Sequence, residues 1–419
     1  MNHNLRQIIY DMRTQPVIAW VTIIGTALSI FLIMTVVMLQ QVYLIPFAPE
    51  SHRDRMLYGC FFHVKGTENG NEMSASLNYR RARQLYGDLE GVETVSYMVK
   101  EAESTDLKGT SGNAFSGYVK QTDDAFWRIY DYELLAGRFY TPEEVAANSH
   151  VAVVSESTAR RLFNGEDAVG RHFSLNHTDY ETIGVVNDAS MLATMAFGDV
   201  FIPIDIEDQW QEQGLGPLCA AMLLSDGTDP EAVRTQVRAR YAEADTEMAS
   251  DGYVTVYHGA PFGQETVSSG LEGSNVTPDD SANRIMYAII YTILLLVPAI
   301  NLSSMLHSRI RRRISDIGVR RAFGCTRRRI VADIIAENLI VTVAGGIVGL
   351  AAGILFAMFY DGLYTGGEGE SVRPALSVLL NFRIIGIAFI ACFILNLVSA
   401  SIPAVQAARV NPVDAINAK

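Results

Sequence analysis

The side chains best suited to covalent chemistry in this sequence are its four cysteines. Cys60 and Cys219 lie in apolar runs typical of strands, and both belong to the long polar segment between the first two apolar stretches, so only they could form a disulfide. Cys325 and Cys392 lie elsewhere in the chain. Two free buried thiols fit the same runs equally well, so the sequence leaves open whether this pair is bridged.

No group of residues has the pattern of a catalytic site. The sequence contains no Gly-x-x-x-x-Gly-Lys-Ser/Thr motif, so ATP cannot be bound here by a P-loop. It also lacks a nucleophile beside a base and the spacing of metal ligands. We therefore expect no catalytic residue, no cofactor and no metal site.

The most distinctive polar pattern is an arginine-rich segment at 309–329. Ile314, Ile317 and Arg321 fall on one helical face there, and Gly318 and Gly324 allow a turn or a close backbone approach. The arginines alone have a simpler interpretation, because basic residues beside a membrane span also contact lipid phosphates. Topology alone would not require the two glycines and the apolar ridge.

Four stretches without Asp, Glu, Lys or Arg must position this segment. They cover 14–49, 285–308, 338–360 and 384–408. Each exceeds the roughly 20 helical residues that cross the hydrocarbon core of a bilayer. Buried helices of soluble proteins are usually shorter and carry a polar face, so we predict four transmembrane helices.

The positive-inside rule orients these helices. The segment between the second and third stretches is rich in arginine, whereas the loop between the third and fourth contains a single basic residue, Arg373. The first loop is therefore predicted inside and the second outside, with both termini in the cytoplasm. Four transmembrane helices are predicted at 16–45, 284–308, 337–361 and 382–405. The cytoplasmic parts are an amphipathic helix at 1–15, a coupling loop or helix at 309–336 and a tail at 406–419. The extracytoplasmic parts are a domain at 46–283 and a loop at 362–381.

The predicted outer segment is acidic. Residues 46–283 hold 17 Lys and Arg against 38 Asp and Glu, a net charge of −21, and the rest of the chain carries +8. Nucleic acid is not an expected partner, because its binding requires basic patches. The acidic excess keeps an exported domain soluble and does not by itself indicate a cationic substrate.

Strand and helix patterns alternate in this outer segment, which we predict to be mixed α/β. Two β-α-β units are predicted, with strands at 57–64, 92–99, 218–224 and 253–257 and helices near 77–89 and 229–244. They flank a segment at 102–196 that consists mostly of short strands. Ser157 is in position to cap a helix in that segment.

Several runs of the middle segment resemble the extracytoplasmic core domain of MacB-type ABC transporter permeases. They are Leu134-Leu-Ala-Gly-Arg-Phe139, Val151-Ala-Val-Val-Ser-Glu-Ser157, Ala159-Arg-Arg-Leu-Phe163, Ala168-Val-Gly-Arg171 and Ile183-Gly-Val-Val186. The resemblance implies a porter-like subdomain made of the two β-α-β units, with a β-rich, sabre-like insert at 102–196.

A second resemblance covers the arginine-rich segment. Arg313-Ile-Ser-Asp-Ile-Gly-Val-Arg-Arg-Ala-Phe-Gly324 is similar to the FtsX-like permease signature, although Asp316 stands for the usual Glu and Cys325 for a common Ala. The C-terminal residues 403–408 and 411–415 resemble the same family. The resemblance implies a coupling helix that docks on a cytoplasmic ATPase. Its residues are Ile314, Asp316, Ile317, Gly318, Val319, Arg320, Arg321, Ala322, Phe323 and Gly324.

Together, these resemblances imply the permease subunit of a MacB/FtsX-like ABC transporter in a bacterial inner membrane. Since no P-loop occurs and only residues 1–15 precede the first predicted span, we expect the ATPase on a separate chain. The implied mechanism is mechanotransmission, in which ATP hydrolysis moves the extracytoplasmic domain for efflux or export. A lipoprotein-releasing or cell-division regulatory complex of the same architecture is the alternative.

Further partners follow from the third apolar stretch and from the family. Gly345, Gly349 and Gly353 form a small-residue ridge that lets helices pack closely in lipid, either within this chain or with a second permease subunit. The resembling permeases work as pairs, homodimeric or heterodimeric. Membrane lipid and a periplasmic adaptor or substrate protein complete the expected partners.

Overall fold

The fold is that of a computed structural model. The structure describes residues 16–68, 70–109, 112, 114–205, 215–250, 252–258, 261–269, 284–293, 296 and 314–359, with scattered positions between 386 and 406. The predicted elements at 1–15 and 362–381 lie outside these residues, as do much of 284–308 and 382–405 and nearly all of 406–419.

The chain divides into two compact units, each described by itself. The helical unit comprises Met1–Gln40, Ala282–Tyr360 and Leu379–Lys419, and the sheet unit comprises Gln41–Ser281 and Asp361–Val378.

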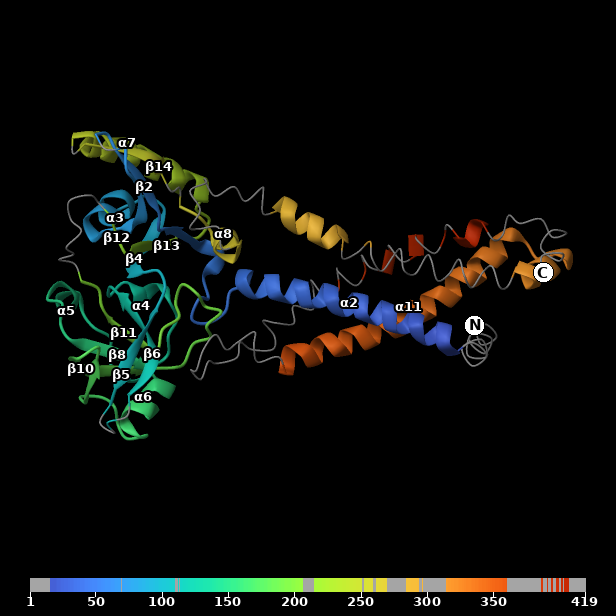
Figure 1. The fold of residues 1–419 in the computed structure, drawn as a ribbon, viewed down its shortest axis with the longest axis horizontal. Coiled ribbons are helices and arrows are strands. Elements are labelled where there is room, and N and C mark those ends of the chain that lie inside the picture. The colour runs from blue at the N-terminus through green and yellow to red at the C-terminus, as the bar shows by residue number, and fades with distance from the viewer. Residues whose placement is uncertain are drawn as a thin grey trace. The chain divides into compact units, whose positions relative to one another are not determined.

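Six strands of the sheet unit pair into a closed ring, which we call the strand ring (Figure 1). Their order is β11-β8-β10-β9-β5-β6, and β11 also pairs with β6. The bounds are β5 (Glu103–Lys108), β6 (Ala114–Thr122), β8 (Val151–Ser155), β9 (His172–Leu175), β10 (Thr178–Val186) and β11 (Val200–Pro203). β7 (Leu134–Gly137) pairs with β10 as an additional strand. The ring includes β11, which lies beyond the predicted end of the insert at 196.

One buried apolar cluster joins the strand ring to α6 (Glu156–Phe163). Leu162 and Phe163 of this helix belong to the same cluster as Val154 of β8 and Phe173 of β9. Apolar burial of this kind contributes about 1.5–3 kcal/mol for each large side chain. The cluster therefore accounts for the position of α6 on the ring.

The helix cap of α6 differs from the prediction. Ser155, not Ser157, is the N-cap, and its hydroxyl accepts a hydrogen bond from the Thr158 amide. The Ser157 amide donates instead to the carboxylate of Asp188. The prediction was wrong because β8 runs directly into α6, which places the cap two residues earlier.

The remaining strands, with two helices, form what we call the outer sheet. Beyond β6 the strand order is β4-β13-β3-β2-β14, with β1 on β13 and β12 on β3. The bounds are β1 (Met56–Gly59), β2 (Phe62–Gly66), β3 (Glu72–Leu77), β4 (Val92–Val99), β12 (Leu215–Gly216), β13 (Leu218–Leu224) and β14 (Tyr253–His258). α3 (Tyr79–Tyr86) packs against β4 and β13, and α7 (Pro230–Ser250) packs against β14 and α3. Short helices lie at Arg53–Arg55 (η1), Phe126–Ile129 (α4), Pro142–Ala146 (α5) and Gln264–Ser269 (α8).

The predicted strand at 57–64 is interrupted. It forms β1 and β2, which separate at Cys60 and Phe61. Cys60 is disulfide-bonded to Cys219 of β13, so the pair that the sequence left open is bridged. The strands predicted at 92–99 and 218–224 are confirmed as β4 and β13.

Three helices make up most of the described helical unit. They are α2 (Pro16–Leu44), α10 (Ile314–Ala322) and α11 (Arg327–Phe359), and residues 284–293 are also helical. The predicted coupling loop or helix at 309–336 contains α10 and the start of α11, which begins before the predicted span at 337. Over the residues that the structure describes, no helix is both long and apolar enough to cross a membrane. The four transmembrane helices stay a prediction.

Candidate functional site

The predicted coupling residues form α10 and the turn that ends it. The Cys325 amide donates to the Arg320 carbonyl and the Gly324 amide donates to the Arg321 carbonyl, each at 3.0 Å. This pair of bonds is the Schellman arrangement, which requires a left-handed residue after the helix. Gly324 supplies it with a φ of +90°, where a side chain would be strained.

The exposed apolar surface of α10 lies on its last turn. Phe323 is 88% exposed and Val319, one turn earlier, is 44% exposed, whereas Gly318 is buried. Phe323 and Val319 therefore leave a small apolar edge exposed at the end of α10. The predicted face of Ile317 and Arg321 is only partly exposed, so the exposed apolar edge differs from it.

The other predicted site residues of this segment are less informative. Arg320 and Ala322 are exposed. Ile314 and Asp316 belong to α10, and their side chains lie outside the described part of the structure.

Three exposed arginines follow at the start of α11. Arg327, Arg328 and Arg329 occupy its first turn, which contains no acidic residue. Cations at a helix N-terminus oppose the helix dipole, so they do not serve the stability of α11. They concentrate positive charge at the start of α11, which suits an acidic protein surface or lipid phosphates.

The three ridge glycines of α11 lie against α2 of the same chain. A Cβ atom would stand 2.7 Å from Thr26 Cβ if placed on Gly345 and 2.5 Å from the Ala27 carbonyl oxygen if placed on Gly349. On Gly353 it would stand 2.9 Å from Cε of Met34. Of the two partners that the sequence left open for this ridge, the structure shows a helix of the same chain, α2.

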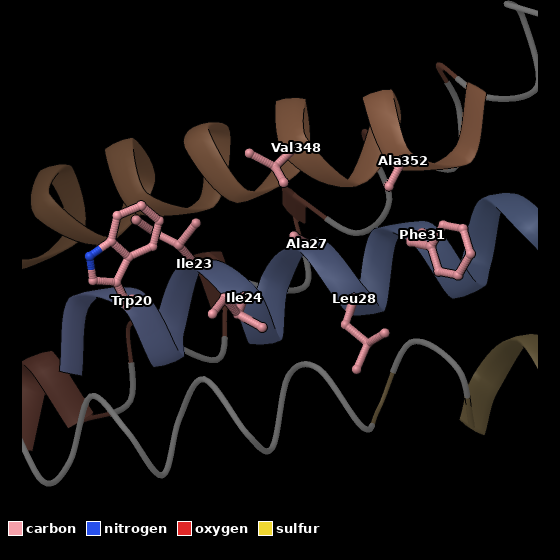
Figure 2. A pocket seen from close by; sticks show the side chains of 8 residues that line it. All are labelled: Trp20, Ile23, Ile24, Ala27, Leu28, Phe31, Val348 and Ala352. Atoms are coloured by element: carbon pink, nitrogen blue, oxygen red, sulfur yellow. The ribbon is translucent and has the colours of Figure 1, made fainter. Parts of the chain in front are cut away.

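An apolar pocket of about 300 Å³ lies beside this helix contact (Figure 2). Val348 and Ala352 line it from α11, and the other lining residues come from α2: Trp20, Ile23, Ile24, Ala27, Leu28 and Phe31. Apart from the Trp20 indole, these side chains offer no polar group that could orient a ligand. The pocket is therefore not a specific ligand site.

The sheet unit contains buried charges that the sequence did not predict. Glu50, Arg53, Lys120 and Asp123 are each at most 7% exposed. Burial lowers the pKa of Lys120 to about 7, against the opposing charges of Glu50 and Glu101. The Lys120 ammonium donates to the Lys100 backbone carbonyl at 2.8 Å.

Asp123 is stabilised differently. Its carboxylate accepts hydrogen bonds from the Ser96 hydroxyl and from the amides of Tyr97 and Phe126. Burial nevertheless raises its pKa to about 7. Within the described residues, no group of three or more His, Cys, Asp or Glu could hold a metal ion.

Comparison with known proteins gives two family matches. Residues 19–240 match the MacB-like periplasmic core domain, and residues 288–412 match the FtsX-like permease C-terminal domain. The first match covers more than half of the chain. A chain with both domains is a bacterial membrane protein with a periplasmic domain.

The curated relatives are distant. The "Uncharacterized ABC transporter permease YknZ" of Bacillus subtilis is 20% identical over 78% of this chain and 77% of its own length. The "Macrolide export ATP-binding/permease protein MacB" of Bdellovibrio bacteriovorus is 25% identical over 67% of this chain. This chain spans only 40% of that relative's length.

A solved structure shows a weaker similarity. The periplasmic region of MacB from Actinobacillus actinomycetemcomitans is 15% identical, with a TM-score of 0.37, over 53% of this chain and 94% of that chain.

Proposed function

Because the chain belongs to the ABC transporter permeases that combine a MacB-like periplasmic core domain with an FtsX-like permease domain, we propose that it transmits force from an ATPase to its periplasmic domain. A permease of this type partners with an ATPase subunit. In the proposed arrangement α10 faces the cytoplasm, the four predicted helices cross the inner membrane, and the sheet unit lies outside.

The observation that carries the proposal is the exposed edge of α10. Phe323 is 88% exposed and is fixed there by the turn at Gly324. Three exposed arginines begin α11, a few residues after Phe323 in the chain. An apolar anchor within a charged rim is the usual composition of a protein docking site.

We place the ATPase on a separate chain. The support is that YknZ of Bacillus subtilis, matched over 77% of its own length, carries the name of a permease alone. Relatives named as ATP-binding/permease proteins are described as exporters of macrolides or pyoverdine. For this chain we propose efflux or export, with a second permease subunit completing the transporter.

The proposal is tested by co-purification with a co-expressed P-loop ATPase of the ABC type. Phe323→Ser removes the anchor and is expected to reduce the recovered ATPase about tenfold or more, since burial of a phenylalanine contributes roughly 1.5–3 kcal/mol. Leu135→Ser is the matched control, because Leu135 is an exposed apolar residue of the sheet unit. Equal recovery with Phe323→Ser, or no recovery with the wild-type chain, would contradict the proposal.

A further inference from the structure

A fully buried ion pair follows directly after α2. Arg53 Nε lies 2.6 Å from Glu50 Oε2, and the two side chains are 0% and 1% exposed. Burial of two charges costs free energy unless their hydrogen bonds are satisfied, so a wholly buried pair calls for an explanation.

The second oxygen of Glu50 binds a distant turn of the chain. Glu50 Oε1 accepts hydrogen bonds from the amides of Met195 and Ala196, both at 2.8 Å. These amides belong to the segment 187–199, which connects β10 to β11. Both strands are members of the strand ring, so Glu50 fastens the chain that leaves α2 to the ring.

Arg53 makes the same connection from the other side. Its guanidinium donates to the Leu192 carbonyl at 2.6 Å and to the Ile45 carbonyl at 3.1 Å. It also lies 4.3 Å from the ring centroid of Phe47. One side chain thus holds the first residue after α2 and the 187–199 segment together.

A backbone bond strengthens the connection. The Asp131 amide donates to the Pro49 carbonyl at 2.9 Å. The Tyr132 hydroxyl, one residue on, donates to the Ala196 carbonyl at 3.0 Å. Asp131 and Tyr132 therefore bind both the segment that follows α2 and the 187–199 segment.

The outer sheet is connected to the end of α2 through β1. After Arg53 the chain enters β1, which pairs with β13 of the outer sheet. In the described part of the sheet unit, direct strand pairing between the outer sheet and the strand ring consists of β4 with β6, through Met98 and Thr122. Asp123, which follows β6, adds hydrogen bonds to Ser96 and Tyr97 of β4. A movement that reaches the ring by this route must first pass through the outer sheet.

We propose that Glu50 and Arg53 are positioning residues that make the strand ring move with the end of α2. This inference rests on the proposed function, because it assumes that the ATPase displaces α2. A buried pair with directional bonds at both ends resists sliding in a way that apolar contacts do not. It joins Ile45, the residue after α2, to the 187–199 segment of the ring, while the chain continues through β1 into the outer sheet.

The test is hydrogen exchange of the full-length chain with its ATPase in lipid nanodiscs, without nucleotide and after trapping with ATP and vanadate. In the wild type, exchange of peptides covering 187–199 is expected to change on trapping. In Glu50→Leu/Arg53→Met that change is expected to fall at least about fivefold, while changes at α10 and β1 persist. An apolar replacement of both ions often preserves stability, so the double variant is chosen over a single one that strands a buried charge.

Two further variants distinguish a loss of transmitted movement from a general loss of stability of the sheet unit. Arg240→Ala removes an α7 side chain that donates to the Leu85 and Asp88 carbonyls within the outer sheet, and the 187–199 response should survive it. Glu50→Gln removes the charge with little change of shape and serves if the double variant does not fold. It should weaken the same response.

The outcomes distinguish this inference from the proposed function. The role of Glu50 and Arg53 alone is overturned if trapping changes the exchange of 187–199 equally in the wild type and in both Glu50 variants. It is also overturned if trapping changes exchange at α10 and β1 of the wild type but not at 187–199. A wild type in which trapping alters exchange nowhere, α10 included, overturns the proposed function as well.

Discussion

At the scale of a residue, the buried Lys120 makes the stability of the sheet unit depend on pH. Its side chain is completely buried, and its pKa is lowered from 10.5 to about 7. Below about pH 7 the lysine is protonated in both the folded and the unfolded chain, so the folded state carries the full cost of a buried ammonium. Between about pH 7 and 10.5 only the folded state releases the proton, and the free energy of unfolding therefore rises with pH.

Lys120→Met is expected to remove this pH dependence. The variant should be more stable than the wild type near pH 7, and the difference should shrink as the pH approaches 10. The measurement is urea-induced unfolding of the full chain, followed by pulse proteolysis of the sheet unit at several pH values. A wild type and variant that differ by the same amount at pH 7 and pH 10 would show that Lys120 does not titrate in this range.

Residues that the sequence identified and residues that it missed differ in where their partners lie. Gly324 is recognisable because the turn that requires it is formed by its own neighbours, Arg320 and Arg321. Glu50 and Arg53 resemble any polar pair after an apolar stretch, since the segment that buries them lies 139 or more residues away. The i, i+3 spacing of opposite charges was the only local signal.

At the scale of elements, the contact of α2 with α11 depends on three glycines. Gly349 is the most constrained, because a Cβ atom there would meet backbone, the Ala27 carbonyl oxygen at 2.5 Å. At Gly353 the nearest atom is the end of a flexible side chain, Met34 Cε at 2.9 Å. The two positions therefore differ in how far their surroundings can yield.

Gly349→Ala should destabilise the helical unit by about 1–3 kcal/mol, the usual cost of overpacking. Gly353→Ala should cost clearly less, because the methionine can move. Both changes raise helix propensity to the same extent, so that effect cancels in the comparison. Thermal unfolding of the detergent-solubilised chain measures both, and a larger loss for Gly353→Ala would refute the assigned contact.

Local patterns predicted individual elements better than their assembly. The strands at 92–99 and 218–224 carry continuous apolar and β-branched patterns, and the structure confirms both. Closure of the strand ring depends on the parallel pairing of β6 with β11, two strands separated by residues 123–199. Period and composition contain no information about such a pairing, which is why the ring was not predicted.

At the scale of the whole molecule, these features form one proposed route for movement from α10 to the sheet unit. In the proposed mechanism the ATPase binds at the exposed Phe323, α2 is displaced, and Glu50 with Arg53 passes the movement to the strand ring. The disulfide between Cys60 and Cys219 holds the junction of β1 and β2 to β13, so the outer sheet can respond as a body. Each step uses a contact within one unit or the continuity of the chain.

The central claim is that an ATPase bound at α10 alters the periplasmic domain. The most direct measurement compares hydrogen exchange across the sheet unit before and after ATP and vanadate trapping, in the wild type and in Phe323→Ser, each reconstituted with the ATPase. The account predicts nucleotide-dependent changes in the sheet unit of the wild type and their loss in Phe323→Ser. Changes confined to α10 and α11 in a transporter that remains active would contradict it.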